Sequence, residues 1–319
     1  MPRLSVPARR SRRFVPRVVV LGDLMLDVVL APENPLVAGT DVAGRVMLRQ
    51  GGSAANTARW LARLGARTTL VAAVGRDPAG RALGRAVRSD GVIARVTRVA
   101  GAKTGRVGVV VAPTGERSFV ADRGAADRLE ALDLRAAWFE KLGLLHLPIY
   151  SLIGDPLGKA ARRAIRLARL AGGQVSLDLA SSGPLLAGGR RVAVAIVQYV
   201  GPDLLFATAA EAEALLGRPE IEGLLAFAPI AVVKRGSEGA TVLAAEAGNR
   251  LRFEVATKRL RAADTTGAGD AFDAGFIVDW LTSRSANRSL RAALQAAALA
   301  GHRAAARQLR TAPTELPLA

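Results

Sequence analysis

The sequence of 319 residues lacks cysteine and contains only two histidines, His146 and His302. Disulfide scaffolds, zinc ribbons, iron–sulfur clusters and thiol nucleophiles are therefore excluded, and so is a histidine-rich metal site. Aromatic residues make up 4% of the chain, which leaves few side chains on which the bases of single-stranded nucleic acid could stack. No apolar run of ~18 residues occurs, so no membrane span is predicted.

Acidic residues are also scarce: 27 Asp and Glu stand against 45 Lys and Arg, for a formal net charge of +18. Such a charge would suit a nucleic-acid or anionic-membrane partner. The basic residues are nearly all arginines, scattered along an Ala- and Gly-rich chain. We interpret them as a habit of composition, and we expect no nucleic-acid partner. A hydrophobic content of 50% is typical of a globular chain, long enough for one large domain or two smaller ones.

The first residues, 1–16, form a basic tail before an apolar run that begins at Arg17. Two arginines followed by an apolar segment resemble a twin-arginine export signal. Asp23 and Asp27 interrupt that segment, however, and a signal peptide does not normally carry carboxylates there. We therefore predict a buried first strand and a cytoplasmic protein.

Short apolar runs bounded by Gly, Asp or Pro alternate with longer segments of helical period, which indicates βαβ units and a parallel sheet. The predicted strands are 17–21, 69–74, 144–147, 174–179, 203–207 and 230–234. The predicted helices include 54–64, 158–171, 209–216, 269–280 and 289–309. The predicted α/β domain therefore spans residues 17–319.

Two segments break this rhythm, at about 28–50 and 104–122. The second alternates on both sides of Pro113, Thr114 and Gly115, which predicts a β-hairpin. We expect the two segments to form a small sheet that lies over the mouth of the main domain as a lid.

The strongest motif runs from Asp264 to Phe272, with the sequence DTTGAGDAF, and leads into an apolar helix. Small residues let a ligand approach the backbone, and the free N–H groups and dipole of the helix start favour an anion. Asp270 would then accept a proton from an attacking hydroxyl while the N–H groups of Ala268, Gly269 and Asp270 stabilise a transferring phosphoryl group. The alternative is a capped helix after a glycine turn.

Two weaker motifs lie near the start of the chain. Gly51 and Gly52 permit a tight loop before a helix, and Asn56 can both donate to and accept from sugar hydroxyls. Asp27 follows the first strand, where an open parallel sheet binds its ligands, so it could accept hydrogen bonds from a polyol. Taken alone, the Gly-Gly motif is more often just a turn, and Asp27 could equally cap a turn.

Together, residues 51–65 and 264–275 resemble the two signature motifs of the ribokinase-like, phosphofructokinase-B type carbohydrate kinases, and the resemblance extends from about Arg17 to the last helix. It implies a Rossmann-like three-layer α/β domain with a mostly parallel sheet, plus a small β-sheet lid. It also implies transfer of the γ-phosphoryl group of ATP to a sugar or related polyol, dependence on Mg²⁺, and in many members a homodimer formed through the lid. No P-loop and no protein-kinase motif occurs.

The resemblance assigns roles residue by residue. The catalytic group comprises Asp270 as base, with Gly267, Ala268 and Gly269 as anion hole. The substrate-binding group comprises Asp27, Gly51, Gly52 and Asn56. The nucleotide-binding group comprises Thr208, Lys234, Gly236 and Gly239.

The chain departs from the family pattern at three places. Thr208 replaces the Asn of an Asn-x-x-Glu element, whose Glu211 would hold Mg²⁺ through water. Met25 stands where ribokinases usually place a sugar-binding Asn. Residues 310–313 lack a glycine found in many relatives, near a monovalent-cation (K⁺) site expected at Asp264 and Thr266.

Three alternatives to a sugar or polyol kinase follow. A nucleoside kinase would need a base pocket, for which Met25 and Phe119 are candidates. A sugar-phosphate acceptor could pair with Arg117 and Arg123. A non-catalytic relative that binds nucleotides or nucleic acid is the third.

Overall fold

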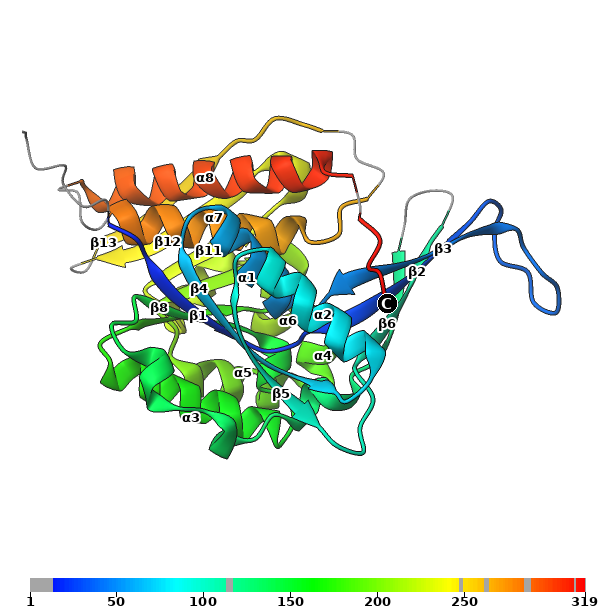
Figure 1. Ribbon diagram of the computed structural model, residues 1–319. Helices are drawn as coiled ribbons and strands as arrows, with labels where there is room; N and C mark the ends of the chain where they lie inside the picture. The colour runs from blue at the N-terminus through cyan, green and yellow to red at the C-terminus, as the bar shows by residue number, and fades with distance from the viewer. Residues whose placement is uncertain are drawn as a thin grey trace, which may run out of the picture.

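The computed structural model describes residues 14–112, 117–246, 249–260, 264–283, 288–312 and 314–318. Most of the predicted basic tail and the predicted turn at Pro113 lie outside these residues. The centre of the molecule is a nine-stranded sheet in the order β13-β12-β11-β10-β9-β8-β1-β4-β5 (Figure 1). Its strands are β1 (Arg17–Leu21), β4 (Arg67–Gly75), β5 (Ile93–Val99), β8 (Leu144–Pro148), β9 (Gln174–Asp178), β10 (Leu204–Thr208), β11 (Ile230–Lys234), β12 (Ala240–Glu246) and β13 (Asn249–Val255).

Every pairing from β11 to β5 is parallel, and only β12 and β13 run antiparallel to their neighbours. The predicted α/β fold with a mostly parallel sheet is therefore confirmed. All six predicted strands are present, and the prediction for β11 matches the observed bounds.

Helices cover both faces of this sheet, as Figure 1 shows. One layer consists of α1 (Ser53–Arg63), α2 (Pro78–Ser89), α7 (Ala268–Ser283) and α8 (Leu290–Arg310). The other consists of α3 (Leu157–Leu170), α4 (Ser182–Leu186), α5 (Arg190–Val200) and α6 (Ala209–Leu216). Because side chains alternate along a strand, Val18 and Val20 enter one core while Val19 and Leu21 enter the other.

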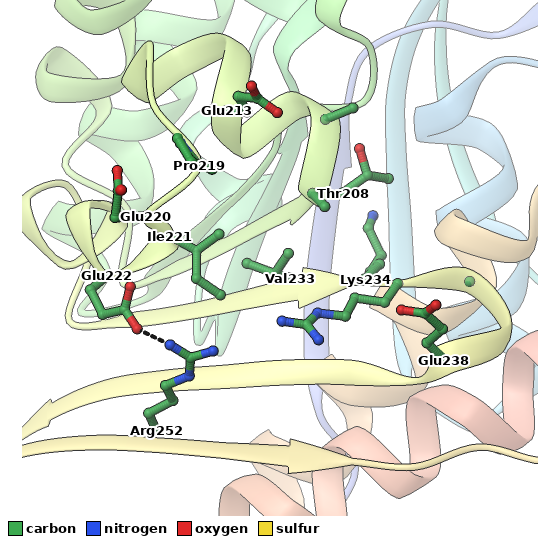
Figure 2. Close-up of a pocket in the computed structure, with 14 residues that line it drawn as sticks. Thr208, Glu213, Pro219, Glu220, Ile221, Glu222, Val233, Lys234, Glu238 and Arg252 are labelled. Carbon is green, nitrogen blue, oxygen red and sulfur yellow. Dashed lines mark hydrogen bonds and ion pairs between the residues drawn. The ribbon is translucent and has the colours of Figure 1, made fainter.

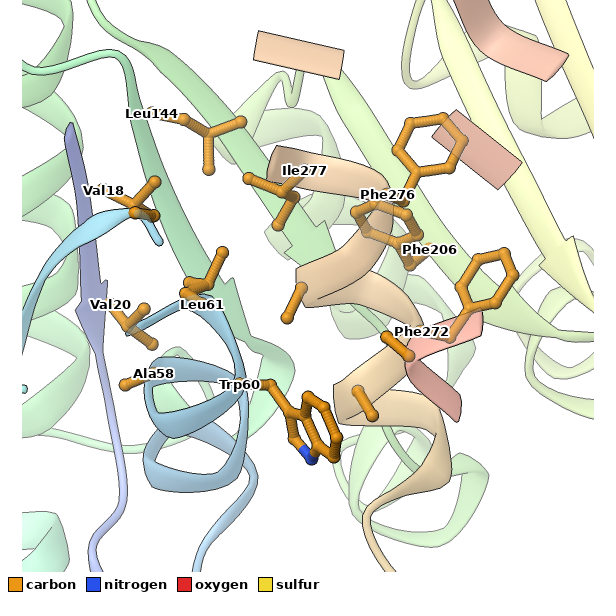
Figure 3. Close-up of a cluster of buried hydrophobic side chains, with 14 of the residues drawn as sticks. Val18, Val20, Ala58, Trp60, Leu61, Leu144, Phe206, Phe272, Phe276 and Ile277 are labelled. Atoms are coloured by element: carbon orange, nitrogen blue, oxygen red, sulfur yellow. The ribbon is translucent and has the colours of Figure 1, made fainter. Parts of the chain in front are cut away.

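The first core contains the aromatic residues nearest the predicted motifs. Figure 3 shows Trp60 of α1 beside α7, with Phe272 and Phe276 of α7 packed near Phe206. The rings of Phe206 and Phe276 meet edge to face with centroids 5.4 Å apart. This packing fixes α7, and with it the segment that precedes the helix.

A separate four-stranded sheet has the order β3-β2-β6-β7. Its strands are β2 (Met25–Pro32), β3 (Gly44–Gly51), β6 (Arg106–Val111) and β7 (Arg117–Asp122). The predicted hairpin is confirmed as the antiparallel pair β6–β7. Residues 314–318 return from α8 to this small sheet, where Leu316 N–H donates to Leu48 carbonyl oxygen at 2.7 Å. Figure 1 shows this terminal segment running from α8 down to β3.

Some elements were not predicted. Helix α2 begins at an N-cap, since the Asp77 carboxylate accepts from Gly80 N–H and Pro78 occupies the first turn. Helix α5 and the hairpin β12–β13 were missed as well, and β2 begins at Met25 rather than at residue 28. Among the described residues, no helix combines the length and apolarity that a membrane crossing requires.

Candidate active site

Carboxyl ends of the central strands, the starts of α1 and α7, and one edge of the small sheet meet at a single site. Asp23 follows β1, and Asp178, Thr208 and Lys234 end β9, β10 and β11. The topology therefore gathers segments that lie far apart in the sequence, as expected for an open parallel sheet.

Asp270, in the first turn of α7, is held by one face of α1. Its Oδ1 accepts from Ser53 Oγ at 2.7 Å, and its Oδ2 accepts from Asn56 Nδ2 at 3.0 Å. Desolvation is the main cause that raises the pKa of Asp270 to about 7, reinforced by the charge of Asp178 and opposed by the Ser53 and Asn56 hydrogen bonds. A carboxylate with such a pKa can take up a proton near neutral pH.

The turn before Asp270 leaves backbone donors open. Gly267 adopts φ +74°, a conformation that glycine reaches without strain. In the described part of the chain, the N–H groups of Gly267, Gly269 and Asp270 donate to no protein acceptor. Ala268 differs from the prediction, because its N–H donates to Thr265 carbonyl oxygen at 3.2 Å. Of the N–H groups in and around the predicted anion hole, three are thus free of protein acceptors in the described part of the chain, and Ala268 closes the turn.

Asp27 lies on β2 and is 9% exposed. Its carboxyl group rests against Gly51, where an added Cβ would stand 1.8 Å from Asp27 Oδ1. Desolvation first, then the charges of Asp23 and Asp270, raise the pKa of Asp27 to about 7, while Arg49 opposes the shift. The predicted substrate residues Asp27 and Gly51 therefore depend on each other sterically.

Gly52 starts α1 with φ +98°, and an added Cβ would stand 2.6 Å from Asp23 carbonyl oxygen. Asp23 also closes the start of the helix: its Oδ1 accepts from Ala54 N–H at 3.0 Å and its carbonyl oxygen from Ala55 N–H at 3.2 Å. Arg123 Nη1 stands 3.5 Å from Asp23 Oδ2. Gly52 thus has a structural reason for its lack of a side chain, and its predicted contact with substrate stays a prediction.

The predicted monovalent-cation site is occupied by protein cations. Arg49 Nη1 donates to Asp264 Oδ2 at 2.7 Å, and Arg117 Nη1 donates to Oδ1 at 2.9 Å. Arg117 also donates to the hydroxyls of Thr265 and Thr266. Burial opposes a low pKa at Asp264, but hydrogen bonds from Thr266 and Arg49 hold the pKa below its usual value. Each oxygen of this carboxylate thus faces a guanidinium group whose positive charge opposes another cation there, so the residues present do not fit a monovalent cation.

Lys234 was predicted to bind nucleotide, but its ammonium group points inward. Nζ donates to Asp178 Oδ1 at 3.0 Å and to both carboxylate oxygens of Asp273 at 3.2 Å. Burial lowers the pKa of Lys234, but the charges of Asp178 and Asp273 outweigh it and raise that pKa. The buried ion pairs tie β9, β11 and α7 together directly behind the turn at Gly269, whose added Cβ would stand 3.6 Å from Nζ.

A cavity of about 890 Å³ lies beside this network. Figure 2 shows Thr208, Val233 and Lys234 on its strand side, with the ion pair of Glu222 and Arg252 at its far end. Gly236 also lines the cavity, whereas Gly239 does not. Gly239 packs elsewhere, since its added Cβ would meet Val255 carbonyl oxygen at 2.2 Å.

Thr208 and Glu211 form a capping box at the start of α6. Glu211 Oε2 accepts from Thr208 N–H at 2.8 Å, and Thr208 Oγ1 accepts from Glu211 N–H at 3.3 Å. This bond uses one carboxylate oxygen of Glu211 and leaves the other for water. Such a donor fits Mg²⁺ that keeps its waters and arrives with phosphates. Within the described ranges, no cluster of three acidic or histidine side chains is arranged to hold a metal by itself.

Several residues of the site were not predicted. Ser53 lies in the motif of the first glycines, and the helical spacing of residues 53 and 56 was a signal that both face Asp270. Asp273 follows Asp270 by three residues, and this spacing was likewise a signal that both lie on the same face of α7. Asp178 and Arg49 gave no local signal, since their partners Lys234 and Asp264 are distant in the sequence.

Comparisons with known proteins find relatives over most of the chain. Residues 15–312 match the pfkB family carbohydrate kinase. The chain is 30% identical over 267 residues to fructokinase-1 of Oryza sativa subsp. japonica, covering 80% of each chain. It is 32% identical over 301 residues to the ATP-dependent ribose-1-phosphate kinase of Halopiger xanaduensis, covering 93% of this chain and 95% of the relative.

A solved structure of fructokinase from Vibrio cholerae O395, with fructose, ADP and calcium bound, superposes with a TM-score of 0.75 at 25% identity. It covers 92% of this chain and 93% of the other.

Proposed function

We propose a reaction for this chain from one premise: the chain belongs to the pfkB family of carbohydrate kinases. It is therefore a phosphotransferase with an alcohol group as acceptor. The proposal is that it transfers the γ-phosphoryl group of ATP to a hydroxyl of a sugar or related polyol. The observation that carries it is the position of the Asp270 carboxylate, with its pKa near 7, beside three open N–H groups.

In the proposed step, the acceptor hydroxyl donates its proton to Asp270 as its oxygen attacks the γ-phosphorus. The bond between that phosphorus and the bridging oxygen breaks, and ADP leaves with the electron pair. The N–H groups of Gly267, Gly269 and Asp270 stabilise charge on the transferring oxygens. Ser53 and Asn56 keep the carboxylate oriented toward the acceptor.

For the nucleotide, we propose the cavity lined by Thr208, Lys234 and Gly236, with Gly239 shaping the neighbouring loop. Lys234 contributes through the ion pairs that fix the strand ends, rather than through a direct bond to phosphate. When Mg²⁺ accompanies ATP, it supplies charge neutralisation of the phosphates, and Glu211 would hold one of its waters.

For the acceptor, we propose that Asp27 accepts hydrogen bonds from sugar hydroxyls in the space bordered by Gly51, Gly52 and Asn56. The small sheet, residues 25–51 and 106–122, would act as the lid, since β2 carries Asp27 and β3 carries Arg49. A nucleoside base finds less support, because Met25 is fully buried in the fold and Phe119 is 60% exposed.

A sugar phosphate is a second candidate acceptor. Arg49 and Arg117 share one carboxylate, Asp264, which leaves one positive charge beside the proposed acceptor space. Arg123 supports it less, because Asp23 and Asp127 already neutralise it. The similarity to a ribose-1-phosphate kinase points the same way.

We also propose a cytoplasmic homodimer formed through the small sheet. The exposed apolar side chains of that sheet include Val46, Phe119 and Val120, and the outer edge of β7 pairs with no strand in the described part of the chain. Sedimentation of the wild type and of Val120→Lys would test the dimer.

The first test is an ATP-consumption screen with Mg²⁺ against fructose, ribose, ribose 1-phosphate and nucleosides, with Asp270→Asn as control. We expect turnover of one acceptor class and its loss in the control. Turnover unaffected by the substitution would refute Asp270 as base. A protein that binds ATP without turnover of any acceptor would support the non-catalytic alternative, and nucleic-acid binding at graded salt would then be measured.

A further inference from the structure

The side chain of Gln308, near the end of α8, bridges α1 and the turn that precedes Asp270. Its Oε1 accepts from Trp60 Nε1 at 3.0 Å, and its Nε2 donates to Thr266 carbonyl oxygen at 3.0 Å. Gln308 also covers Gly267, whose added Cβ would stand 3.5 Å from Nε2. Three segments that are distant in the sequence are thus joined through one amide.

The chemistry of the indole fixes the direction of this amide. An indole N–H can only donate, so the oxygen of Gln308 must face Trp60 and the nitrogen must face Thr266. The ring itself is held, because it belongs to the core in Figure 3 and the guanidinium groups of Arg63 and Arg307 lie 5.6 and 5.9 Å from it.

Holding the Thr266 carbonyl has two effects on the turn. In a planar trans peptide the carbonyl and the next N–H point in opposite directions, so Gly267 N–H is aimed away from α8. In addition, Thr266 carbonyl oxygen is the acceptor that Asp270 N–H would use if the helix extended one residue backward. Gln308 engages that oxygen and helps to hold it away from the helical position, and Asp270 N–H makes no bond to it.

We propose that Gln308, oriented by Trp60, is a positioning residue that keeps the N–H groups of Gly267 and Asp270 aimed at the transferring phosphoryl group. The inference rests on the proposed function, because only phosphoryl transfer gives those donors a task. Gln308 touches no reacting atom. Its effect should therefore appear in kcat more than in the KM of either substrate.

The test compares Gln308→Met, which keeps length and removes both hydrogen bonds, with a matched pair elsewhere. Trp280 Nε1 donates to Gln174 Oε1 at 3.1 Å, so Gln174→Met removes the same kind of indole–amide bond away from the turn. We expect Gln308→Met to lower kcat by roughly tenfold or more with KM changed less than about twofold. Gln174→Met should lose thermal stability alone. Equal kcat in Gln308→Met and wild type, or equal losses in both variants, would overturn the proposal.

A double-mutant cycle tests whether Trp60 acts through Gln308. Trp60→Phe removes the indole donor and keeps an aromatic ring. If Trp60 serves to orient the amide, Trp60→Phe should lower kcat, and adding it to Gln308→Met should cause little further loss. Multiplicative losses would show that Trp60 acts independently and would refute this part of the proposal.

An NMR experiment separates failure of the inference from failure of the proposed function. The chain has three tryptophans, and Trp60→Phe identifies the indole N–H signal of Trp60. ADP, Mg²⁺ and fluoroaluminate mimic a phosphoryl group at the turn. We expect them to shift the Trp60 signal in wild type and not in Gln308→Met, whichever acceptor the enzyme uses. An unmoved Trp60 signal in the wild type with bound ADP and fluoroaluminate would overturn the inference, whereas absence of turnover with every acceptor would count against the proposed function.

Discussion

The starts of α1 and α7 both follow glycine-rich turns, yet their backbone donors have opposite fates. At α1, Asp23 accepts from the N–H groups of Ala54 and Ala55, so the helix start is closed by protein atoms. At α7, the N–H groups of Gly269 and Asp270 have no acceptor in the described part of the chain. The same local signal thus yields one capped helix and one candidate anion site.

The difference is made by residues far from either turn. Asp23 closes α1 from the end of β1, thirty-one residues before Ala54. At α7, Gln308 instead donates to Thr266 carbonyl oxygen, and no side chain accepts from the N–H groups of Gly269 and Asp270 in the described part of the chain. A glycine-rich helix start is therefore informative about ligand binding only when the tertiary partners of its first N–H groups are known.

The largest effect on activity should come from a substitution at the start of α7, where the backbone donors are open. Asp270→Asn keeps the shape of the side chain but removes the proton acceptor, and we expect kcat to fall roughly 10²- to 10⁴-fold with an unchanged circular dichroism spectrum. Steady-state kinetics with ATP and the best acceptor would measure it. Retention of near wild-type kcat would show that the open donors work without this base.

The next effect is on pH dependence. Burial raises the pKa of Asp270 to about 7, and the base must be ionised to accept a proton. We expect kcat to rise about tenfold per pH unit below pH 7 and to level off above it. Asp27→Asn is the control, because Asp27 has a similar pKa. If kcat still rises with pH in Asp27→Asn, the rise is caused by ionisation of Asp270. If the rise is absent in that variant, it is caused by ionisation of Asp27.

A substitution at the start of α1, where Asp23 accepts from the first N–H groups, should change the stability of the protein. Asp23→Ala removes the side-chain acceptor of Ala54 N–H, which is buried, and should lower the free energy of unfolding by roughly 1–3 kcal/mol. Asp122→Ala, which breaks an exposed pair with Arg106, should change it by less than ~0.5 kcal/mol. Chemical denaturation of both variants would measure the two changes. Equal stabilities would mean that Asp23 does not close α1.

A smaller stability change should follow from Asp27→Asn. Because burial raises the folded-state pKa of Asp27 from 3.8 to about 7, its protonated form favours folding below pH 3.8 and this contribution is lost as the pH rises through 7. Asparagine avoids the burial of a charge. The variant should therefore melt higher than wild type at pH 8, by about 2–5 °C, and the gain should shrink at pH 5. Melting curves of both proteins at pH 5 and pH 8 would measure this. A difference in melting temperature that is the same at both pH values would contradict the prediction.

The smallest effect is expected from monovalent cations. Since Arg49 and Arg117 occupy the carboxylate of Asp264, replacing KCl by choline chloride should leave kcat and KM unchanged. Arg117→Met frees one oxygen of Asp264, and a K⁺ effect that arises only in that variant would strengthen the comparison. Potassium activation of the wild type would contradict the structure at Asp264.

The fold could be predicted from the sequence because its central strands are short apolar runs that are buried on both faces, as β11 illustrates. Alternation around residues 113–115 similarly predicted β6 and β7. Helix α5 was missed because its buried positions are few and its exposed face carries apolar residues such as Val192 and Tyr199. Local pattern could not separate such a helix from the core.

The parts of the site that lie within one sequence motif could be predicted. The parts that depend on contacts between distant segments could not. Asp270 and its turn stand in one motif, whereas the ion pair of Lys234 with Asp178 spans two strands. A lysine after a strand suggests a phosphate ligand as readily as a buried cation, and the choice depends on carboxylates that only the fold brings near. Asp264 was misread for the same reason, since Arg49 and Arg117 come from the small sheet.

The hydrogen bond from Leu316 to Leu48 bears on how the chain is made. Strand β3 leaves the ribosome early, but its partner Leu316 follows only after α8 and the strands of both sheets described above have been synthesised. During translation the outer edge of β3 is therefore without this partner. The docking of residues 314–318 on β3 is therefore a late event, because it joins a strand made early to a segment that follows α8.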